Sequence, residues 1–99
     1  MGKKHYLDFD WDIKYAKKLV DVFAQLKTKE GFKKFLADIL TVKELKEVIR
    51  RLGIAELLSQ GKTYEEIRKE LHVTPTTINR VNMKLKHGKG GYKLIFKQK

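Results

Sequence analysis

The stretch "LHVTPTTINR", from Leu71 to Arg80, decides the fold of the C-terminal half of the chain. It holds the only proline of the sequence, Pro75, directly after Thr74. Proline suits the first position of a helix, because its fixed φ is helical and its missing N–H would be unpaired there. Threonine suits the preceding N-cap, because its hydroxyl accepts a hydrogen bond from an amide of the first turn. The pair predicts a helix from Pro75 to about His87, ended by "GKGG".

The residues before this stretch predict a shorter helix. Thr63 and Glu66 have the spacing of a capping box, and only "HVT" separates the two helices, which is typical of a helix-turn-helix. An ordinary helical hairpin is the alternative, because Arg68 and His72 stand where helix-turn-helix motifs favour a small residue and a glycine. His72 would have to adopt the left-handed conformation. The apolar residues that would pack the pair are Ile67, Leu71, Val73, Ile78 and Val81.

Apolar residues at three- and four-residue steps predict three helices upstream of this pair. The first spans about Trp11 to Leu26 and begins near Asp10 or Asp12. The second lies within residues 32–40. Because the sequence has no strand-rich region and no repeat, the predicted fold class is all-α with five helices.

A second capping box, Thr41 with Glu44, opens the third of these upstream helices. The helix is predicted to run through Gly53 to about Gln60, with Gly61 as its stop. Glycine inside a helix costs about 0.5 to 1 kcal/mol relative to alanine. Gly53 therefore marks either a break in the helix or a point where another part of the chain packs closely.

The formal net charge is +11, and no Asp or Glu occurs from Leu71 onward. This balance predicts a polyanionic partner, of which nucleic acid is the commonest, although solubility alone is an alternative explanation. No apolar run approaches the ~20 residues of a membrane span, and no secretory signal or cysteine is seen. We therefore expect no membrane association and a cytoplasmic location. The basic residues after Leu71 include Arg80, Lys84, Lys86, Lys89, Lys93, Lys97 and Lys99.

Winding at about 100° per residue divides the helix that starts at Pro75 into two faces. Ile78, Val81 and Leu85 point toward a core, and the opposite face carries no acid. In a major groove, arginine pairs with guanine O6/N7 and asparagine with adenine N6/N7. Amides at a helix start, here those of the two threonines after Pro75, can hold a phosphate oxygen. The predicted DNA-binding residues are Thr76, Thr77, Asn79, Arg80, Met83, Lys84 and Lys86.

Structural roles remain open for several of these residues. Arg80 could instead pair with Glu70, and Met83 could be buried against a second subunit. The two threonines after Pro75 could be plain first-turn residues. Asn82 lies near the apolar side of the helix, so a structural hydrogen bond is predicted for it in place of a base contact.

Residues that could support catalysis or hold a metal are sparse. His5, His72 and His87 are far apart in sequence, and no cluster of His, Asp and Glu has metal-ligand spacing. The "GKGG" segment follows a helix and lacks the rest of the phosphate-loop pattern. We therefore expect no enzymatic activity, no metal and no cofactor.

Four segments, "FLADILT", "LLSQGKTYEEI", "TINRVNMKLKHG" and "GGYKL", resemble the Trp repressor-like family. The resemblance extends from Phe35 to Leu94 and is greatest to the shorter branch of the family, the TrpR-like proteins of the YerC/YecD type. It implies a five-helix Trp repressor-like fold in an intertwined homodimer. Two helix-turn-helix units would then face a palindromic operator about one DNA turn, roughly 34 Å, apart. The resemblance also implies a shared core that includes Phe23, Phe32, Phe35 and Leu40.

The same resemblance implies a division of the chain and a function. Residues 1–10 would be an N-terminal extension, 11–60 the dimerisation helices, 62–87 the helix-turn-helix and 88–99 a basic tail. The tail is either mobile or folds its apolar residues, Leu94, Ile95 and Phe96, back onto the body. The function implied is that of a sequence-specific transcriptional regulator, a repressor, bound to double-stranded DNA. A basic helical module that binds RNA or an acidic protein is the alternative.

The tryptophan-binding repressors of the family hold their corepressor with residues that match Thr41, Arg51 and Arg80 of this sequence. These three are therefore the candidate effector-binding residues. Val81, however, stands where those repressors have a glycine that leaves room for the ligand, and Lys84 stands where they have a serine. A valine side chain would fill space that an indole needs, so we do not expect tryptophan as corepressor. Whether another small molecule binds stays open.

Overall fold

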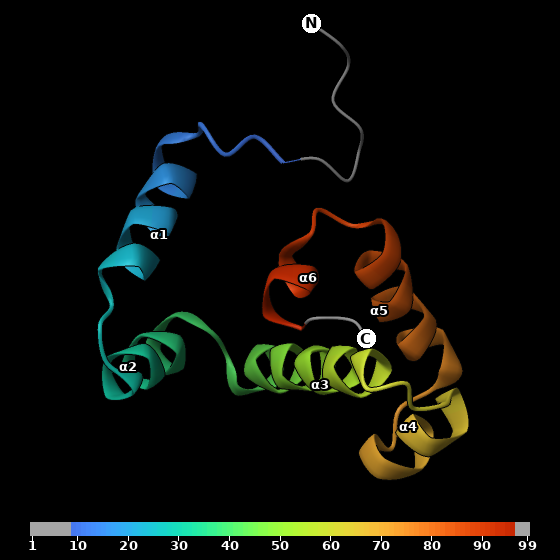
Figure 1. The fold of residues 1–99 in the computed structure, drawn as a ribbon. Coiled ribbons are helices and arrows are strands. Elements are labelled where there is room, and N and C mark those ends of the chain that lie inside the picture. Colours follow the sequence, from blue (N-terminus) through green and yellow to red (C-terminus); the bar gives the residue numbers. More distant parts are fainter. Residues whose placement is uncertain (1–8, 97–99) are drawn as a thin grey trace, which may run out of the picture. The chain divides into compact units, whose positions relative to one another are not determined.

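A computed structural model describes residues 9–96 of the chain, and all of its regular structure is helical (Figure 1). The predicted all-α class is confirmed, and the predicted number of five helices is corrected by a sixth near the C-terminus. Most of the predicted N-terminal extension, and Lys97 and Lys99 of the tail, lie outside the described residues. The helices are α1 (Lys14–Gln25), α2 (Lys29–Ile39), α3 (Val42–Ser59), α4 (Tyr64–Leu71), α5 (Pro75–His87) and α6 (Gly91–Ile95).

The described chain divides into two compact units, with the boundary in the sequence between Ile39 and Leu40. The first contains α1 and α2, and the second contains α3 to α6. This boundary differs from the predicted segments, whose roles remain predictions.

The first unit is held together by aromatic rings but buries none of the side chains of its two helices. The ring of Phe23 lies 5.9 Å from that of Phe32 and 5.6 Å from that of Phe35, centroid to centroid. Ile13 and Val20, from the predicted apolar stripe of the first helix, are each about half exposed, at 51%. A single copy of the unit therefore leaves much of its apolar stripe in water.

The start of α1 differs from the prediction. Asp10 does not cap the helix, because its carboxylate accepts a hydrogen bond from the amide of Asp12, two residues later, at 3.0 Å. That bond closes a local turn of the kind aspartate forms with its own backbone. The helix begins at Lys14, with Ile13 as an N-cap that makes no side-chain bond.

The second helix begins earlier than the predicted range of residues 32–40, within the segment "TKEG" from Thr28 to Gly31. The hydroxyl of Thr28 accepts a hydrogen bond from the amide of Gly31 at 3.0 Å, as an N-cap does. Lys29 is therefore the first residue of the helix, which starts three residues before Phe32. The cap was obscured in the sequence because Gly31 is a poor helix former.

The capping box that opens α3 is confirmed. The hydroxyl of Thr41 accepts from the amide of Glu44 at 3.1 Å, and the Glu44 carboxylate accepts from the amide of Thr41 at 2.9 Å. The helix continues without a break through Gly53. A methyl group built on Gly53 would lie 3.4 Å from Cδ1 of Leu71. Gly53 therefore does not break the helix, and it lies where α3 packs closely against α4.

We expect Gly53→Ala to raise the free energy of unfolding by about 0.5 to 1 kcal/mol, because alanine loses less backbone entropy in a helix. Leu71 is the one side chain that the added methyl would meet, and it does so at van der Waals distance. The control is Gly61→Ala: Gly61 has φ +84, where alanine is strained, so that variant should be less stable than the parent. Urea unfolding at one protein concentration measures both. A less stable Gly53→Ala variant would contradict this expectation and would mean that the methyl group does not fit against Leu71.

The core of the second unit lies where α3, α4 and α5 pack against one another. Each of these helices contributes a side chain with no exposed area: Ile54, Ile67 and Ile78, respectively. The predicted packing between α4 and α5 is confirmed, and Leu71 of α4 is half-buried against the same cluster. The buried residues of the cluster are Ile54, Ala55, Ile67, Val73, Ile78 and Val81.

The sixth helix corrects the prediction for the tail. Tyr92 and Phe96 are half-buried against the core, whereas Leu94 and Ile95 are 86% and 67% exposed. Phe96 is the C-cap of this helix, and its amide donates to the carbonyl of Tyr92 at 2.7 Å, so the two side chains, four residues apart, lie on the same side. Of the three apolar residues expected to fold back, only Phe96 does so.

Candidate nucleic-acid interface

The helix-turn-helix begins at a complete capping box. The hydroxyl of Thr63 accepts from the amide of Glu66 at 3.1 Å, and the Glu66 carboxylate accepts from the amide of Thr63 at 2.8 Å. The bond from the Thr63 amide is the main reason that the pKa of the Glu66 carboxyl lies below its usual value. This box sets the first residue of α4 at Tyr64.

The turn between α4 and α5 has the predicted geometry. His72 takes the left-handed conformation, with φ 55 and ψ 47, in the position that often needs glycine. Thr74 caps α5 by accepting the amide of Thr77 at 3.2 Å, and Pro75 is the first helical residue. The side chain of Arg68 lies at the surface, so it does not separate the two helices there. Both departures from the helix-turn-helix pattern are thus accommodated.

The two faces of α5 are as the sequence predicts. Ile78, Val81 and Leu85 are buried, with at most 4% of their surface exposed. The opposite face lies in water and is free of acids along the whole helix. The exposed residues of this basic face of α5 are Thr76, Asn79, Arg80, Met83, Lys84, Lys86 and His87.

Arg80 has no ion pair within residues 9–96, the part of the chain that the structure describes. The alternative of a bond to Glu70 is therefore not seen in this single chain. Other arginines nearby do have acid partners: Arg68 pairs with Glu65, which holds the pKa of the Glu65 carboxyl below its usual value. The guanidinium of Arg80 is thus available to an external acceptor.

Thr77 is tied to the N-cap of its own helix. Its amide donates to the Thr74 hydroxyl, and the two hydroxyls are 3.1 Å apart, within hydrogen-bond distance. The side chain is also half-buried. This bonding favours a structural role for Thr77 over the predicted contacts with DNA, and leaves the predicted phosphate contact to the amide of Thr76.

A polar relay links the two helices of the motif. Nδ2 of Asn82 donates to the hydroxyl of Tyr64 at 3.0 Å, and that hydroxyl donates to Oδ1 of Asn79 at 3.4 Å. The structural hydrogen bond predicted for Asn82 is therefore confirmed. The sequence analysis did not identify this role of Tyr64. Its position directly after the capping threonine was the available signal, because a tyrosine can place its ring in the core and its hydroxyl at the edge of the core.

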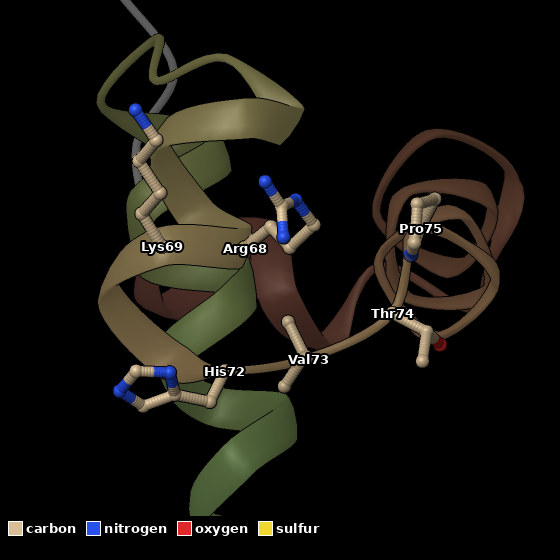
Figure 2. A pocket seen from close by; sticks show the side chains of 6 residues that line it. All are labelled: Arg68, Lys69, His72, Val73, Thr74 and Pro75. Carbon is tan, nitrogen blue, oxygen red and sulfur yellow. The ribbon is translucent and has the colours of Figure 1, made fainter.

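A pocket lies at the turn, between α4 and the start of α5 (Figure 2). Arg68 lies on the side of α4 that faces Pro75, whereas Lys69 and His72 point away from it (Figure 2). The sequence did not single out Lys69 as part of the site, since it is one of many lysines. The lining residues are Arg68, Lys69, His72, Val73, Thr74 and Pro75.

The candidate effector residues do not form a compact group in one chain. The hydroxyl of Thr41 is engaged in the capping box, and Arg51 is an exposed residue that pairs with Glu47 at 3.7 Å. Arg51 lies ten positions after Thr41, a rise of about 15 Å along the helix axis between the two backbones. Val81 fills core space, and the exclusion of tryptophan stays a prediction.

Two further features were sought among the described residues, a metal-ligating group and a membrane-spanning helix. Between residues 9 and 96, no group of three or more His, Asp and Glu side chains is placed to hold a metal ion. None of the helices in this range combines the length and the apolar character needed to cross a membrane.

Comparison with known proteins gives consistent matches. Residues 14–99 match the family model described as Trp repressor protein. An uncharacterised protein of Bacillus subtilis (strain 168), YerC, is 32% identical over 76 residues, which cover 77% of this chain and 73% of YerC. The crystal structure of a Trp repressor candidate from Staphylococcus aureus is 32% identical, with a TM-score of 0.77 over 82% of this chain and 81% of that one. A TrpR-like protein from Eubacterium eligens is 27% identical, with a TM-score of 0.82 over 87% and 89%.

Proposed function

Because the chain belongs to the Trp repressor family, we propose that it is a sequence-specific DNA-binding transcriptional regulator that works as a dimer and represses from a palindromic operator. The observation that carries the proposal is the basic face of α5, which is exposed and acid-free directly after a helix-turn-helix turn. A helix of this composition can enter a major groove and present donors to base edges.

The length of α5 and the positive charges in its last turn fit a major groove. Thirteen residues give a helix about 20 Å long, which exceeds the ~12 Å width of the major groove. Lys84 and Lys86 lie in its last turn. We assign these two side chains to phosphates beside the groove, where they would position the helix without reading sequence.

A second copy of the chain accounts for the apolar residues that a single copy leaves in water. On α3, Val48, Ile49 and Leu52 are each 46 to 59% exposed, and on α1 the stripe at Ile13 and Val20 is half exposed. Exposed apolar residues gathered on helices are typical of subunit interfaces. Two copies related by a two-fold axis would offer two α5 helices to two half-sites.

Selection of random duplexes with the purified protein tests the proposal. We expect an enriched palindrome whose half-sites lie about 10 base pairs apart, centre to centre. The affinity for the enriched duplex should fall steeply with salt, by about 10³-fold or more between 50 and 200 mM if the dimer contacts six or more phosphates. Fluorescence anisotropy with labelled duplexes measures this slope.

An RNA of matched length and a scrambled duplex serve as controls. Equal affinity for all three would contradict sequence-specific DNA binding and would favour a general polyanion binder. A single enriched half-site without its inverted copy would contradict the dimer while leaving the DNA-binding helix in place.

A further inference from the structure

The relay through Tyr64 has a direction, which is given by the amide atoms that face the tyrosine hydroxyl. The amide nitrogen of Asn82 can only donate, so the Tyr64 hydroxyl accepts from it at 3.0 Å. The single proton of that hydroxyl is then directed to the next acceptor, which is Oδ1 of Asn79 at 3.4 Å. The relay therefore runs from Asn82 through Tyr64 to Asn79.

Tyr64 is well placed to act as the fixed point of this relay. Its ring is half-buried against the core cluster, and its backbone follows the capping threonine at the start of α4. Asn82 is half-buried as well, whereas Asn79 is exposed on the basic face of α5. The hydroxyl thus connects a side chain held at the edge of the core with one that faces outward.

The consequence for Asn79 is a defined amide orientation. With Oδ1 turned toward Tyr64, the group left to face an external partner is the Nδ2 amine, which carries two donors and no acceptor. The familiar asparagine contact with adenine needs the amide oxygen and nitrogen together, because adenine offers the N7 acceptor and the N6 donor. Guanine, with O6 and N7, and thymine, with O4, offer only hydrogen-bond acceptors on their major-groove edges.

We propose that Tyr64 is a specificity-determining positioning residue, which holds Asn79 as a donor so that it selects guanine or thymine over adenine at its base position. This assignment rests on the proposed function, since it concerns the readout of the same α5 helix. It departs from the simple expectation that an asparagine on a reading helix selects adenine.

The experiment begins with the protein alone. In ¹⁵N-labelled wild-type protein, we expect an ordered side-chain amide for Asn79, and in Tyr64→Phe we expect its order parameter to fall below about 0.6. The control is Tyr92→Phe: Tyr92 also packs its ring on the core, but its hydroxyl has no hydrogen-bond partner among residues 9–96. An Asn79 amide that is equally ordered in Tyr64→Phe and wild type would overturn the proposal, whatever the protein binds.

The second readout is base preference. Asn79→Ala identifies the base pair that Asn79 faces, as the position whose preference weakens in a selection from random duplexes. At that position the wild type should enrich guanine or thymine, and Tyr64→Phe should reduce the preference over adenine by about fivefold or more, because the freed amide can rotate. Enrichment of adenine by the wild type would contradict the proposal.

A double-mutant cycle shows whether Tyr64 acts through Asn79. In the Asn79→Ala background, adding Tyr64→Phe should change base preference no further. An equal effect in both backgrounds would assign Tyr64 a general packing role and overturn the proposal. If the wild type prefers no sequence, the proposed function fails and the base selectivity of Asn79 fails with it, whereas release of the amide in Tyr64→Phe would still establish the positioning step.

Discussion

Ile78→Ala is expected to lower the free energy of unfolding by about 2 to 5 kcal/mol. Ile78 has no exposed surface and lies on α5 in the core cluster with Ile54 and Ile67, so the change removes buried methyl groups and leaves a cavity at the junction of three helices. A domain of this size is stabilised by only about 5 to 15 kcal/mol in total, so the loss is a large fraction of its stability. Urea unfolding followed by circular dichroism measures it.

The matched control is Ile95→Ala, which makes the same chemical change on α6, where the side chain is 67% exposed. It should alter stability by no more than about 0.5 kcal/mol. Both variants are compared at one protein concentration, because assembly adds a concentration-dependent term to apparent stability. Equal losses at Ile78 and Ile95 would contradict the core described here.

The second unit could be predicted closely because its helix ends are encoded locally. Thr41, Thr63 and Thr74 each place a hydroxyl where an amide of the first turn needs an acceptor, and each cap is found where the sequence places it. Pro75 adds a constraint that depends on no distant residue. In this region, local chemistry and tertiary packing favour the same structure.

Predictions failed where the outcome depends on competing local bonds or on distant packing. Asp10 and Asp12 resemble helix caps, but the carboxylate of Asp10 is used in a turn with Asp12. The helix at Gly91–Ile95 follows several glycines and is too short for a clear period, so its formation depends on the contacts of Tyr92 and Phe96 with the core. Neither effect can be deduced from apolar spacing.

The candidate site was predicted in part, for a similar reason. The exposure of Arg80 and the burial of Val81 follow from helical winding alone. The bond between Asn82 and Tyr64 joins residues 18 positions apart, so the sequence could predict that Asn82 needs a partner but could not identify it. The same relay changes what Asn79 offers to a base, which depends on a contact between two helices.

Arg80→Ala is expected to remove about 1 to 3 kcal/mol of discrimination between the operator and random DNA for each half-site, the amount that a bidentate arginine contact with guanine provides. Arg80 is exposed on the basic face of α5 and has no acid partner within the described range of residues 9–96, so its guanidinium needs no internal bond to be broken before it reaches a base. Anisotropy titrations with the selected operator and a scrambled duplex measure the ratio.

Two substitutions separate base reading from charge. Lys86→Ala removes one positive charge from the same helix, as Arg80→Ala does, and should weaken both duplexes alike while lowering the salt slope by about 1 for each subunit. Arg80→Lys keeps the charge but loses the planar fork that fits guanine O6 and N7, so it should retain affinity for the scrambled duplex and still lose discrimination. If Arg80→Ala instead weakens operator and scrambled DNA equally, with the behaviour of Lys86→Ala, then Arg80 is a phosphate contact, and the sequence-reading role belongs to the other residues of the basic face of α5.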